Sequence, residues 1–582
     1  MESNDDTNIR EETVRKALTL HLYGENRKGS CPVSVESDKE GKCGLYSVST
    51  CDISRGEKIM ESYSVNLALD HPYRSTRCGF CACPLMNYNQ SSSSESSLCK
   101  VCKMVAFCPN CEKAGAKKWH EESGECRVLS CLVLCFKHLF LQEGQSNNPE
   151  TEIKSNNNDS EEVLEKDANE VDSTIFLTMR LMCRKFSDLS LGEKKGDKYS
   201  LPSIDWNLFD SLYSTRFSKD KGQSENETIN QYNIAIGILC TLVKEQFIKK
   251  SCEKNKKNGD NEDNEKEYWD GSWITKENFD DVLGKVMGCC HAVTDVTLEL
   301  GCQCLGRALF LEHSFYNHSC VPNSFLSCHF PQISNDKTEE DNHCCALKSR
   351  VYCLQDIEKR KPITLSYIPT SGLDREERNS RLKEGYNFAC KCEACVDSDQ
   401  TSRWEQHTKV PPECDIYAIR QLQYSCNQSL LEIQVSLTED PDCDIGASLE
   451  NCIGLIQMCS RGIENQKIPS SHEVSIEVHR LLATAFSLSE KMKESFAEHR
   501  AFFKSIDPIK EIFDPVAVAT QRLKFSQDLE RDKDTSEALS QLLLAHDLCS
   551  TVLGGDHLLT TSILNKKKSM ENQKLHKKAK LK

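Results

Sequence analysis

Long hydrophobic runs are missing from this sequence of 582 residues. Its two most apolar stretches, Cys131–Leu141 and Ile234–Val243, are about half as long as the roughly 20 residues that cross a bilayer. The first of them is also interrupted by Lys137 and His138. We therefore exclude a membrane-spanning protein. The opening residues lack a basic segment followed by an apolar one, so we expect no secretory signal.

Positive charge is also scarce, with 73 Lys and Arg against 89 Asp and Glu and a net charge of −16 at pH 7. This balance disfavours direct binding of nucleic acid. Two segments, 142–172 and 251–267, are rich in charged residues and asparagine, and we interpret them as solvated loops between folded regions. The tail 566–582 is rich in lysine, and it is either a nuclear localisation signal or a disordered end.

The hydrophobic periodicity changes along the chain. Alternating patterns predict short strands on both sides of an Arg55-Gly56 turn and again within Leu305–Tyr367. Helical spacing predicts helices within 173–250 and over Trp273–Thr297. From about residue 410 to 564 the pattern is helical throughout, which predicts an all-helical region.

Cysteine, by contrast, is abundant, with 34 residues. Without a secretory signal we expect reduced thiols, and clustered thiols then indicate metal binding. Residues 78–126 hold three consecutive Cys-x2-Cys pairs, then a histidine and a last cysteine, with Cys83 as a spare thiol. This spacing is typical of two tetrahedral zinc sites rather than of incidental thiols. The eight candidate ligands are Cys78, Cys81, Cys99, Cys102, Cys108, Cys111, His120 and Cys126.

The most specific motif is Asn317–Asn323, which reads Asn-His-Ser-Cys-Val-Pro-Asn. A polar turn alone would explain its proline and last asparagine, but not the segments around it. Upstream stand Gly44-Leu45 and Arg55-Gly56-Glu57, and downstream stand Ile363–Tyr367 and the Cys-x-Cys-x2-Cys group within Tyr386–Cys395. That group offers three thiols, so a zinc bound there needs a distant fourth ligand.

In order and spacing these segments resemble the SET domain of protein lysine methyltransferases, and the cysteine-rich segment resembles the MYND zinc finger. We identify the chain as a divergent member of the SET-and-MYND (SMYD) family. The resemblance implies an α+β, multidomain fold: a β-rich SET fold split by the finger and a helical insert, then an all-α, TPR-like C-terminal domain. The implied regions are 28–77 (N-terminal half of the SET domain), 78–126 (MYND finger), 127–300 (helical insert with acidic loops), 301–370 (core SET), 380–397 (post-SET zinc segment), 405–565 (helical C-terminal domain) and 566–582 (basic tail).

The resemblance also implies how the zinc ligands are shared. In the family's cross-brace, the first and third pairs bind one zinc, and the second pair binds another together with the histidine and the last cysteine. Cys320 would complete a third site with the post-SET thiols. The implied sets are Cys78, Cys81, Cys108 and Cys111; Cys99, Cys102, His120 and Cys126; and Cys320, Cys390, Cys392 and Cys395.

Methyl transfer from a sulfonium to an amine needs a neutral lysine aligned with the methyl carbon, and a narrow aromatic channel favours that state. Tyrosine suits such a wall, although Tyr367 or Tyr386 taken alone is more often a core residue. The resemblance implies that the Tyr367 hydroxyl lies beside the transferred methyl group and that Tyr386 lines the lysine channel. It implies S-adenosylmethionine as cofactor, contacted by Gly44, Ser314, Asn317, His318, Tyr367 and Phe388.

Three departures from the family pattern bear on activity. Arg360-Lys361-Pro362 replaces Gly-Glu-Glu before the tyrosine strand, which alters a turn and removes two acids near the implied substrate entrance. Cys43 replaces the usual asparagine or lysine of the first cofactor loop. A family asparagine expected near Cys289–His291 is absent. We expect these changes to weaken cofactor binding.

Two functional hypotheses follow. The first is a SAM-dependent protein-lysine N-methyltransferase with three zinc ions, acting on a lysine of a histone or of another protein. The alternative is a catalytically weak or inactive adaptor that binds peptides of partner proteins through its finger. For either we expect a monomer in the nucleus or the cytoplasm, and binding of the cofactor discriminates between them.

Overall fold

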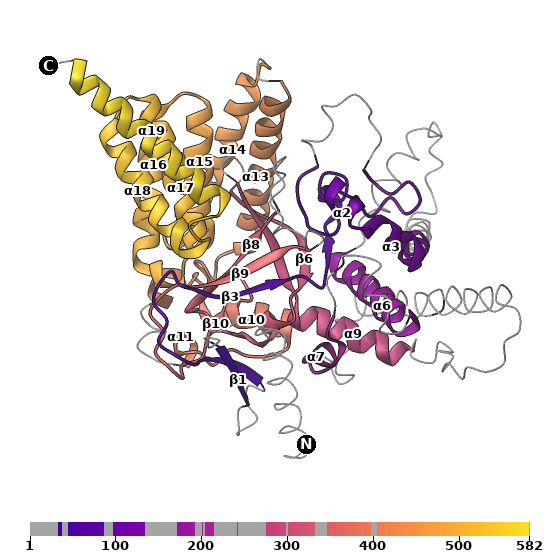
Figure 1. Cartoon of the computed structure of the whole chain (residues 1–582). Coiled ribbons are helices and arrows are strands. Elements are labelled where there is room, and N and C mark those ends of the chain that lie inside the picture. The colour runs from indigo at the N-terminus through magenta and orange to yellow at the C-terminus, as the bar shows by residue number, and fades with distance from the viewer. Residues whose placement is uncertain are drawn as a thin grey trace, which may run out of the picture.

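The computed structural model describes residues 33–37, 45–85, 97–133, 172–191, 201, 204–214, 241, 275–297, 301–331, 346–396, 404–440 and 443–580. In Figure 1 the strands lie in the centre, with the helices that follow residue 410 gathered on one side of them. The helices of the cysteine-rich segment and of the insert lie on the other side. The fold is therefore mixed α and β, with helical regions flanking a strand-rich one. Within the described ranges no helix is long and apolar enough to cross a bilayer.

The strands of the described residues form four small sheets. Two are two-stranded, in the orders β1-β2 and β10-β7, and two are three-stranded, in the orders β3-β9-β8 and β4-β6-β5. All pairs are antiparallel except β10 with β7. The bounds are β1 (Val33–Ser37), β2 (Leu45–Ser49), β3 (Lys58–Tyr63), β4 (Asn66–Leu69), β5 (His291–Thr297), β6 (Gly301–Leu309), β7 (Asn317–His318), β8 (Ser324–His329), β9 (Lys348–Cys353) and β10 (Thr364–Leu365).

The strands predicted on both sides of the Arg55-Gly56 turn are present as β2 and β3. They do not pair with each other, because β2 pairs with β1 whereas β3 pairs with β9. Gly56 has a φ of +81°, a left-handed conformation that glycine adopts without steric cost. The turn therefore joins two different sheets.

The short parallel pair β7-β10 brings together the two sequence motifs Asn317–Asn323 and Ile363–Tyr367. Asn317 lies opposite Thr364 and His318 opposite Leu365, and the Ser319 N–H donates to the Leu365 carbonyl oxygen at 2.9 Å. This pairing places the residues after Asn317 next to the strand that leads into the predicted catalytic tyrosine.

The insert contributes helices α6 (Ser173–Leu191), α7 (Trp206–Asp210) and α9 (Lys276–Cys289). The prediction of a helix over Trp273–Thr297 was wrong in its second half, because α9 ends at Cys289 and β5 begins at His291. Four of the seven residues of β5 are valine or threonine, which favour a strand, and the segment pairs with β6. The described residues of the helical region predicted over 127–300 therefore end in a strand.

The cysteine-rich segment carries two short helices, α2 (Pro109–Lys113) and α3 (Ala116–Glu122). The Cys108 side chain accepts the Cys111 N–H and so caps the start of α2. The buried residues of this segment share one hydrophobic core with α6 and α9. Packing therefore ties the segment firmly to the insert.

Helices α13 to α19 make up the region after residue 410. Their bounds are α13 (Ile416–Glu439), α14 (Gly446–Asn465), α15 (Glu473–Leu488), α16 (Met492–Ile506), α17 (Pro515–Arg531), α18 (Thr535–Val552) and α19 (Leu558–Lys580). Consecutive helices pack together in pairs, with one core for α13 to α15 and another for α17 to α19. Helix α19 continues past residue 565 and buries Met570, so it runs through the boundary predicted for the basic tail.

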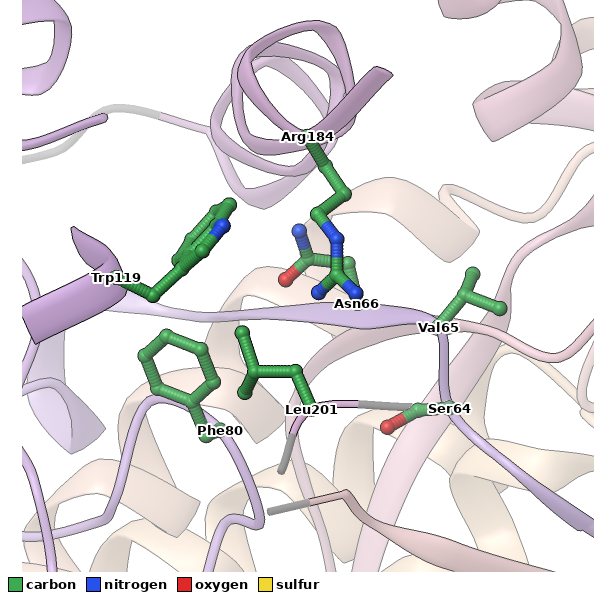
Figure 2. Close-up of a pocket in the computed structure, with 7 residues that line it drawn as sticks. All are labelled: Ser64, Val65, Asn66, Phe80, Trp119, Arg184 and Leu201. Carbon is green, nitrogen blue, oxygen red and sulfur yellow. The ribbon is translucent and has the colours of Figure 1, made fainter. Parts of the chain in front are cut away.

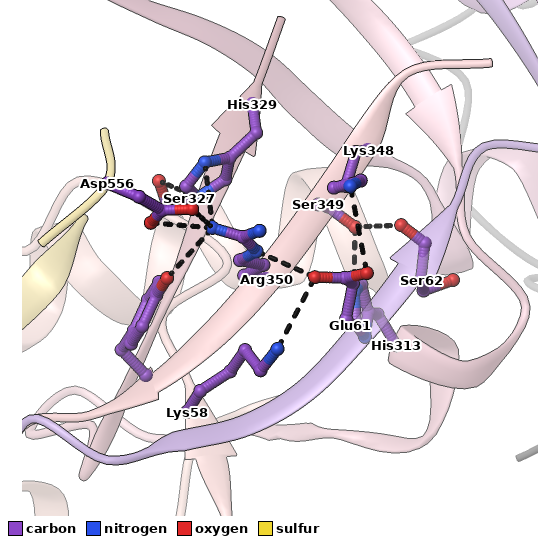
Figure 3. Close-up of polar contacts among 11 residues, drawn as sticks. Lys58, Glu61, Ser62, His313, Ser327, His329, Lys348, Ser349, Arg350 and Asp556 are labelled. Carbon is purple, nitrogen blue, oxygen red and sulfur yellow. Dashed lines mark hydrogen bonds and ion pairs between the residues drawn. The ribbon is translucent and has the colours of Figure 1, made fainter. Parts of the chain in front are cut away.

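The C-terminal helices meet the sheet β3-β9-β8 at the loop between α18 and α19. Arg350 of β9 donates to both carboxylate oxygens of Asp556, at 2.8 and 2.6 Å, and its Nε lies 2.8 Å from the Glu61 carboxylate on β3 (Figure 3). Gly554 lies against the Tyr352 ring, where a Cβ would stand 2.1 Å from the phenol oxygen. One strand residue thus links a loop of the helical region to two strands.

Candidate active site and zinc centres

The twelve predicted metal ligands gather in three groups of four, and these groups are the sets implied by the cross-brace and the post-SET site. Within each group the candidate ligand atoms all lie within 4.8 Å of one another. The two sulfur atoms lie 3.8 Å apart in Cys81 and Cys108 and 3.5 Å apart in Cys99 and Cys126. A tetrahedral zinc with Zn–S bonds of about 2.3 Å separates its sulfurs by about 3.8 Å. The geometry and the donor chemistry therefore fit zinc, and the described cysteines are all free thiols.

The histidine of the second group is oriented by a buried ion-pair network. His120 Nδ1 lies 2.5 Å from Glu125 Oε2, and its Nε2 lies 3.4 Å from the Cys102 sulfur. A carboxylate only accepts hydrogen bonds, so Nδ1 carries the proton and Nε2 turns its lone pair toward the thiols. This is the tautomer that binds a metal.

Glu125 is in turn held by Arg180 of α6. The Arg180 Nε donates to Glu125 Oε1 at 2.7 Å, and its Nη1 donates to the carbonyl oxygens of Leu67 and Gly79, each at 2.5 Å. Arg180 and Glu125 are fully buried, and the guanidinium also stacks 4.7 Å from the Phe80 ring centroid. The second zinc group is thereby joined to the insert helix and to strand β4.

The third group brings Cys320 against the cysteines that follow α10 (Arg375–Tyr386), partly on α11 (Glu393–Val396). The Cys320 sulfur lies 3.9 Å from that of Cys390 and 3.6 Å from that of Cys395. The guanidinium of Arg378 is buried and lies 3.9 Å from the Cys395 sulfur. A zinc with four thiolates carries a net charge of −2, and Arg378 offsets part of it.

Tyr367, Tyr386 and Phe388 form an aromatic group next to the third zinc set. The Tyr367 hydroxyl donates to the Tyr316 carbonyl oxygen at 2.7 Å, and the Tyr386 hydroxyl donates to the Tyr367 carbonyl oxygen at 3.1 Å. The two tyrosine ring centroids lie 4.9 Å apart, and Phe388 meets the Tyr367 ring edge to face at 6.4 Å. Burial raises the pKa of both tyrosines, so both phenols are protonated at neutral pH.

His318 positions the backbone of Tyr367. Its Nδ1 accepts the Tyr367 N–H at 3.0 Å, and its Nε2 lies 3.4 Å from the Cys320 sulfur. Burial lowers the pKa of His318 to about 4. Both ring nitrogens of this predicted cofactor ligand therefore have protein partners, while its neighbour Asn317 lies on the same short strand.

A cavity opens beside these tyrosines, with about 440 Å³ of space that includes solvent at its mouth. The Ser314 hydroxyl, on its wall, donates to the Phe310 carbonyl oxygen at 2.9 Å. Gly44, the remaining predicted cofactor residue, lies outside the described residues. The cavity is lined by Gly288, Cys289, Cys290, His291, Ala292, His313, Ser314, Ser366, Tyr367 and Tyr386.

Two imidazoles on this wall each have a buried nitrogen without a hydrogen-bond partner, His291 Nε2 and His313 Nδ1. The other nitrogen of His313, Nε2, lies 2.8 Å from the Ser349 hydroxyl. Burial lowers the pKa of His291 to about 4 and that of His313 to about 3. Both rings are therefore neutral at pH 7, and each keeps one buried nitrogen without a partner.

The altered turn before Tyr367 lies against β2. The Arg360 N–H donates to the Ser49 carbonyl oxygen at 2.9 Å, and Pro362 forms a bridge with Val48. Arg360, which stands where the family has glycine, has a φ of +67°, a left-handed conformation that costs a non-glycine residue roughly 1 kcal/mol. None of the described residues that line the cavity comes from this turn.

A second hollow lies where the cysteine-rich segment meets the sheet, and Figure 2 shows its walls. Phe80 and Trp119 of the segment face Asn66 of β4, and Arg184 of α6 reaches toward them. The Arg184 guanidinium lies 5.3 Å from the Trp119 ring centroid. The hollow is a packing junction between three regions, separate from the cavity beside Tyr367.

Comparison with known proteins relates parts of the chain to methyltransferases. It is 37% identical over 92 residues to a SET and MYND domain-containing protein of Dictyostelium discoideum (16% of this chain, 22% of the relative). It is 36% identical over 120 residues to the protein-lysine N-trimethyltransferase SMYD5 of Danio rerio (19% and 26%). It is 28% identical over 124 residues to the N-lysine methyltransferase SMYD2 of Homo sapiens (20% and 23%).

These partial matches support membership of the SET-and-MYND family. The chain spans about a quarter of the length of these curated relatives. No family model matches the chain. Family membership therefore rests on the partial relatives, and the arrangement of the site rests on the geometry described above.

Several residues of this SET-and-MYND protein that support the site were not singled out from the sequence. Glu125 and Arg180 orient His120, Arg378 faces the third thiol group, and His291 and His313 line the cavity. One signal was available: Arg180 is a charged residue among the apolar positions of a helix, where an unpaired charge is costly. The histidines gave no comparable signal, because a lone histidine is compatible with most environments.

Proposed function

We propose that this SET-and-MYND protein is a SAM-dependent protein-lysine N-methyltransferase that methylates a lysine of a histone or of another protein. Relatives named as protein-lysine and histone-lysine methyltransferases support the reaction class. The observation that carries the proposal is the position of Tyr367, whose ring lines the cavity while its hydroxyl is fixed on the Tyr316 carbonyl oxygen. We further propose that the protein is a monomer of the nucleus or the cytoplasm.

The cavity fits S-adenosylmethionine in its chemistry. The cofactor carries an α-ammonium and an adenine amino group, which are hydrogen-bond donors, and a sulfonium cation. His291 and His313 each keep a buried ring nitrogen with no partner, and Tyr367 and Tyr386 offer aromatic faces that attract a cation. When bound, the cofactor supplies the electrophilic methyl group. Asn317 and Phe388 are the further residues proposed to hold it.

The tyrosines would prepare the acceptor lysine. Their rings lie 4.9 Å apart, and burial keeps both hydroxyls protonated, so they act as hydrogen-bond partners and not as bases. The described lining of the cavity contains no carboxylate, so no ion pair stabilises a lysine ammonium there. Partial exclusion of water then favours the neutral amine that attacks the methyl carbon. The Tyr367 hydroxyl would orient that amine.

The three clusters of four candidate ligands are proposed as structural zinc sites. The third lies beside the aromatic group, because Cys320 follows His318 by two residues and Cys390 follows Phe388 by two. A zinc there would hold the segment that carries Tyr386 and Phe388 against the strand pair that carries His318. Without this zinc we expect Tyr386 and Phe388 to lose their fixed positions next to Tyr367.

The deciding experiment is calorimetric titration of S-adenosylmethionine into the zinc-loaded protein. We expect micromolar binding that Asn317→Ala weakens, together with methyl transfer from labelled cofactor to a protein substrate that Tyr367→Phe abolishes. Asn317→Ala is a cleaner control than His318→Ala, since His318 also contacts Tyr367 and Cys320. A folded, zinc-loaded protein that binds no cofactor would contradict the proposal and support the adaptor hypothesis.

A further inference from the structure

Arg307 is a half-buried cation on β6 with no partner for its guanidinium. In the described part of the chain, no side chain or carbonyl oxygen lies within hydrogen-bond or ion-pair distance of that group. A cation that has lost part of its water normally gains a carboxylate or carbonyl partner. The guanidinium is thus open to a partner that the described residues do not supply.

The register of the sheet places this guanidinium next to the cavity. Arg307 lies directly opposite Ala292 of β5, and residues opposite each other in an antiparallel pair project from the same face. Ala292 lines the cavity that Tyr367 and Tyr386 also line. Arg307 therefore stands on the face of the sheet that borders the proposed lysine channel.

The electrostatics agree with this placement. Burial raises the pKa of Tyr386 and of Cys290, and the positive charge of Arg307 acts against that rise at both groups. Both groups line the cavity. The charge of Arg307 is thus felt at the wall where the acceptor lysine would enter.

An approaching substrate meets this charge before the reaction. A lysine ammonium flanked by neutral or basic residues is repelled by Arg307, whereas a carboxylate beside the lysine is attracted and can bind the guanidinium through two hydrogen bonds. The described cavity lining holds no carboxylate that would neutralise Arg307 first. Substrates with an aspartate or glutamate next to the acceptor lysine are therefore favoured.

We propose that Arg307 is a specificity-determining residue that binds a carboxylate of an aspartate or glutamate close to the acceptor lysine in the substrate. The inference rests on the proposed methyltransferase function and specifies its substrate class: lysines in a locally acidic sequence. The contact is made with the substrate as it binds, so its effect belongs in KM rather than in kcat.

The test uses fluorescein-labelled peptides with one lysine flanked on both sides by Asp, by Asn or by Arg. Methyl transfer is measured with labelled S-adenosylmethionine, and binding is measured by anisotropy with S-adenosylhomocysteine present. The variants are Arg307→Gln, Arg307→Glu and, as matched control, Arg461→Glu, an exposed charge reversal on α14. Thermal melting and zinc content show that each is folded, and Arg307→Gln serves if the reversal is unstable.

We expect the wild-type protein to prefer the Asp peptide over the Asn peptide by roughly tenfold in kcat/KM, mostly through KM. Arg307→Gln should remove the preference, Arg307→Glu should shift it to the Arg peptide, and Arg461→Glu should behave as wild type. The preference should also shrink as salt is raised, because the contact is open to solvent.

The remaining outcomes separate the two proposals. Methyl transfer without an acidic preference, or with one that Arg307→Glu leaves unchanged, would overturn the role of Arg307 and leave the methyltransferase function standing. Charge-selective binding that Arg307→Glu reverses, without any methyl transfer, would support the role of Arg307 and overturn the reaction. If the protein shows no methyl transfer and no charge-selective binding, both proposals are overturned.

Discussion

At the scale of single residues, His291 is the residue most relevant to binding of the proposed cofactor. The family pattern places an asparagine near Cys289–His291, and its absence predicts weaker cofactor binding. The structure puts the imidazole of His291 on the cavity wall with Nε2 buried and without a partner. Since burial lowers the pKa of His291 to about 4, the ring is neutral at pH 7, and Nε2 is a polar atom that a hydrogen-bonding group of the cofactor would satisfy.

Replacing His291 should therefore separate a hydrogen-bonding role from a packing role. We expect His291→Leu to raise the Kd for S-adenosylmethionine about tenfold, which is roughly 1.4 kcal/mol, because the hydrogen-bonding group is lost. His291→Asn places an amide at this position and should keep the Kd within about threefold of wild type. Calorimetric titration measures both. Equal Kd values for the two variants would show that His291 is only a wall residue.

The residues that the sequence identified are those whose chemistry depends on spacing. Cys-x2-Cys pairs hold two thiols on one turn whatever surrounds them, so spacing identified most of the ligands, whereas their division into groups and the distant Cys320 were implied by the family resemblance. Arg307 and His291 gain their meaning only from strand register and cavity shape, which no local pattern encodes. Arg360 is intermediate: its departure from glycine was visible, but its left-handed backbone was not.

At the scale of secondary-structure elements, the link between the cysteine-rich segment and α6 is the most consequential contact. Arg180 of α6 holds Glu125, which orients His120 of the second zinc group. The side chains of Arg180, Glu125 and His120 are all fully buried. Loss of one member leaves the other charge uncompensated, which costs roughly 3–5 kcal/mol.

Arg180→Met should therefore weaken metal binding most at the second group, affect the first group less through the lost contact with Gly79, and spare the third. We expect zinc affinity at the second group to fall about 10–100-fold, because the carboxylate that orients His120 is no longer held in place. Competition with a chromogenic chelator should then remove one zinc per protein much earlier than the rest. Lys117→Met is the matched control, since Lys117 and Glu112 form an exposed pair at 3.0 Å. Simultaneous release of all zinc from Arg180→Met would contradict this assignment.

Secondary structure was predicted well where the hydrophobic periodicity stays the same over many residues, and poorly where that periodicity changes. The helices after residue 410 keep a helical period through many turns, and the structure is helical there. Between α9 and β5 the period changes within two residues, so a helix predicted over the whole stretch extended too far. The pairing of β2 and β3 with other strands depends on distant partners and could not be predicted locally.

At the scale of the whole molecule, buried histidines couple folding to pH. His313 is fully buried, its Nε2 contacts the Ser349 hydroxyl, and burial lowers its pKa to about 3. The unfolded chain protonates this residue near pH 6.5. Between pH 6.5 and 3 the unfolded state thus binds a proton that the native state does not, and the free energy of unfolding falls as pH falls.

We expect His313 to contribute about 1.4 kcal/mol to the loss of stability between pH 7.5 and pH 5.5. His313→Gln keeps a donor for Ser349 and does not titrate, so its stability should fall less over the same interval. Urea unfolding of the zinc-loaded proteins at both pH values gives the comparison. If wild type and His313→Gln lose equal stability, His313 is not a source of the pH dependence.

One contact between the C-terminal helices and the sheet requires a glycine. Gly554 has a φ of +88°, and a Cβ there would stand 2.1 Å from the phenol oxygen of Tyr352 on β9. The two loop residues that meet the sheet, Gly554 and Asp556, were not identified from the sequence as contacts, because their partners on β9 are some two hundred positions away. Asp556 binds Arg350 only if the loop keeps its approach to the sheet (Figure 3).

Gly554→Ala should destabilise the protein by roughly 2–3 kcal/mol, of which about 1 is left-handed strain and the rest is the clash with the ring. Urea unfolding measures the loss, and hydrogen exchange should rise in β9 and at the end of α18 as the loop moves away. Gly555→Ala is the matched control, since a Cβ there meets nothing within 4 Å. In a Tyr352→Ala background the cost of Gly554→Ala should fall to the strain alone. An unchanged cost in that background would show that the ring does not set the position of the loop, and that the helices dock onto the sheet through other contacts.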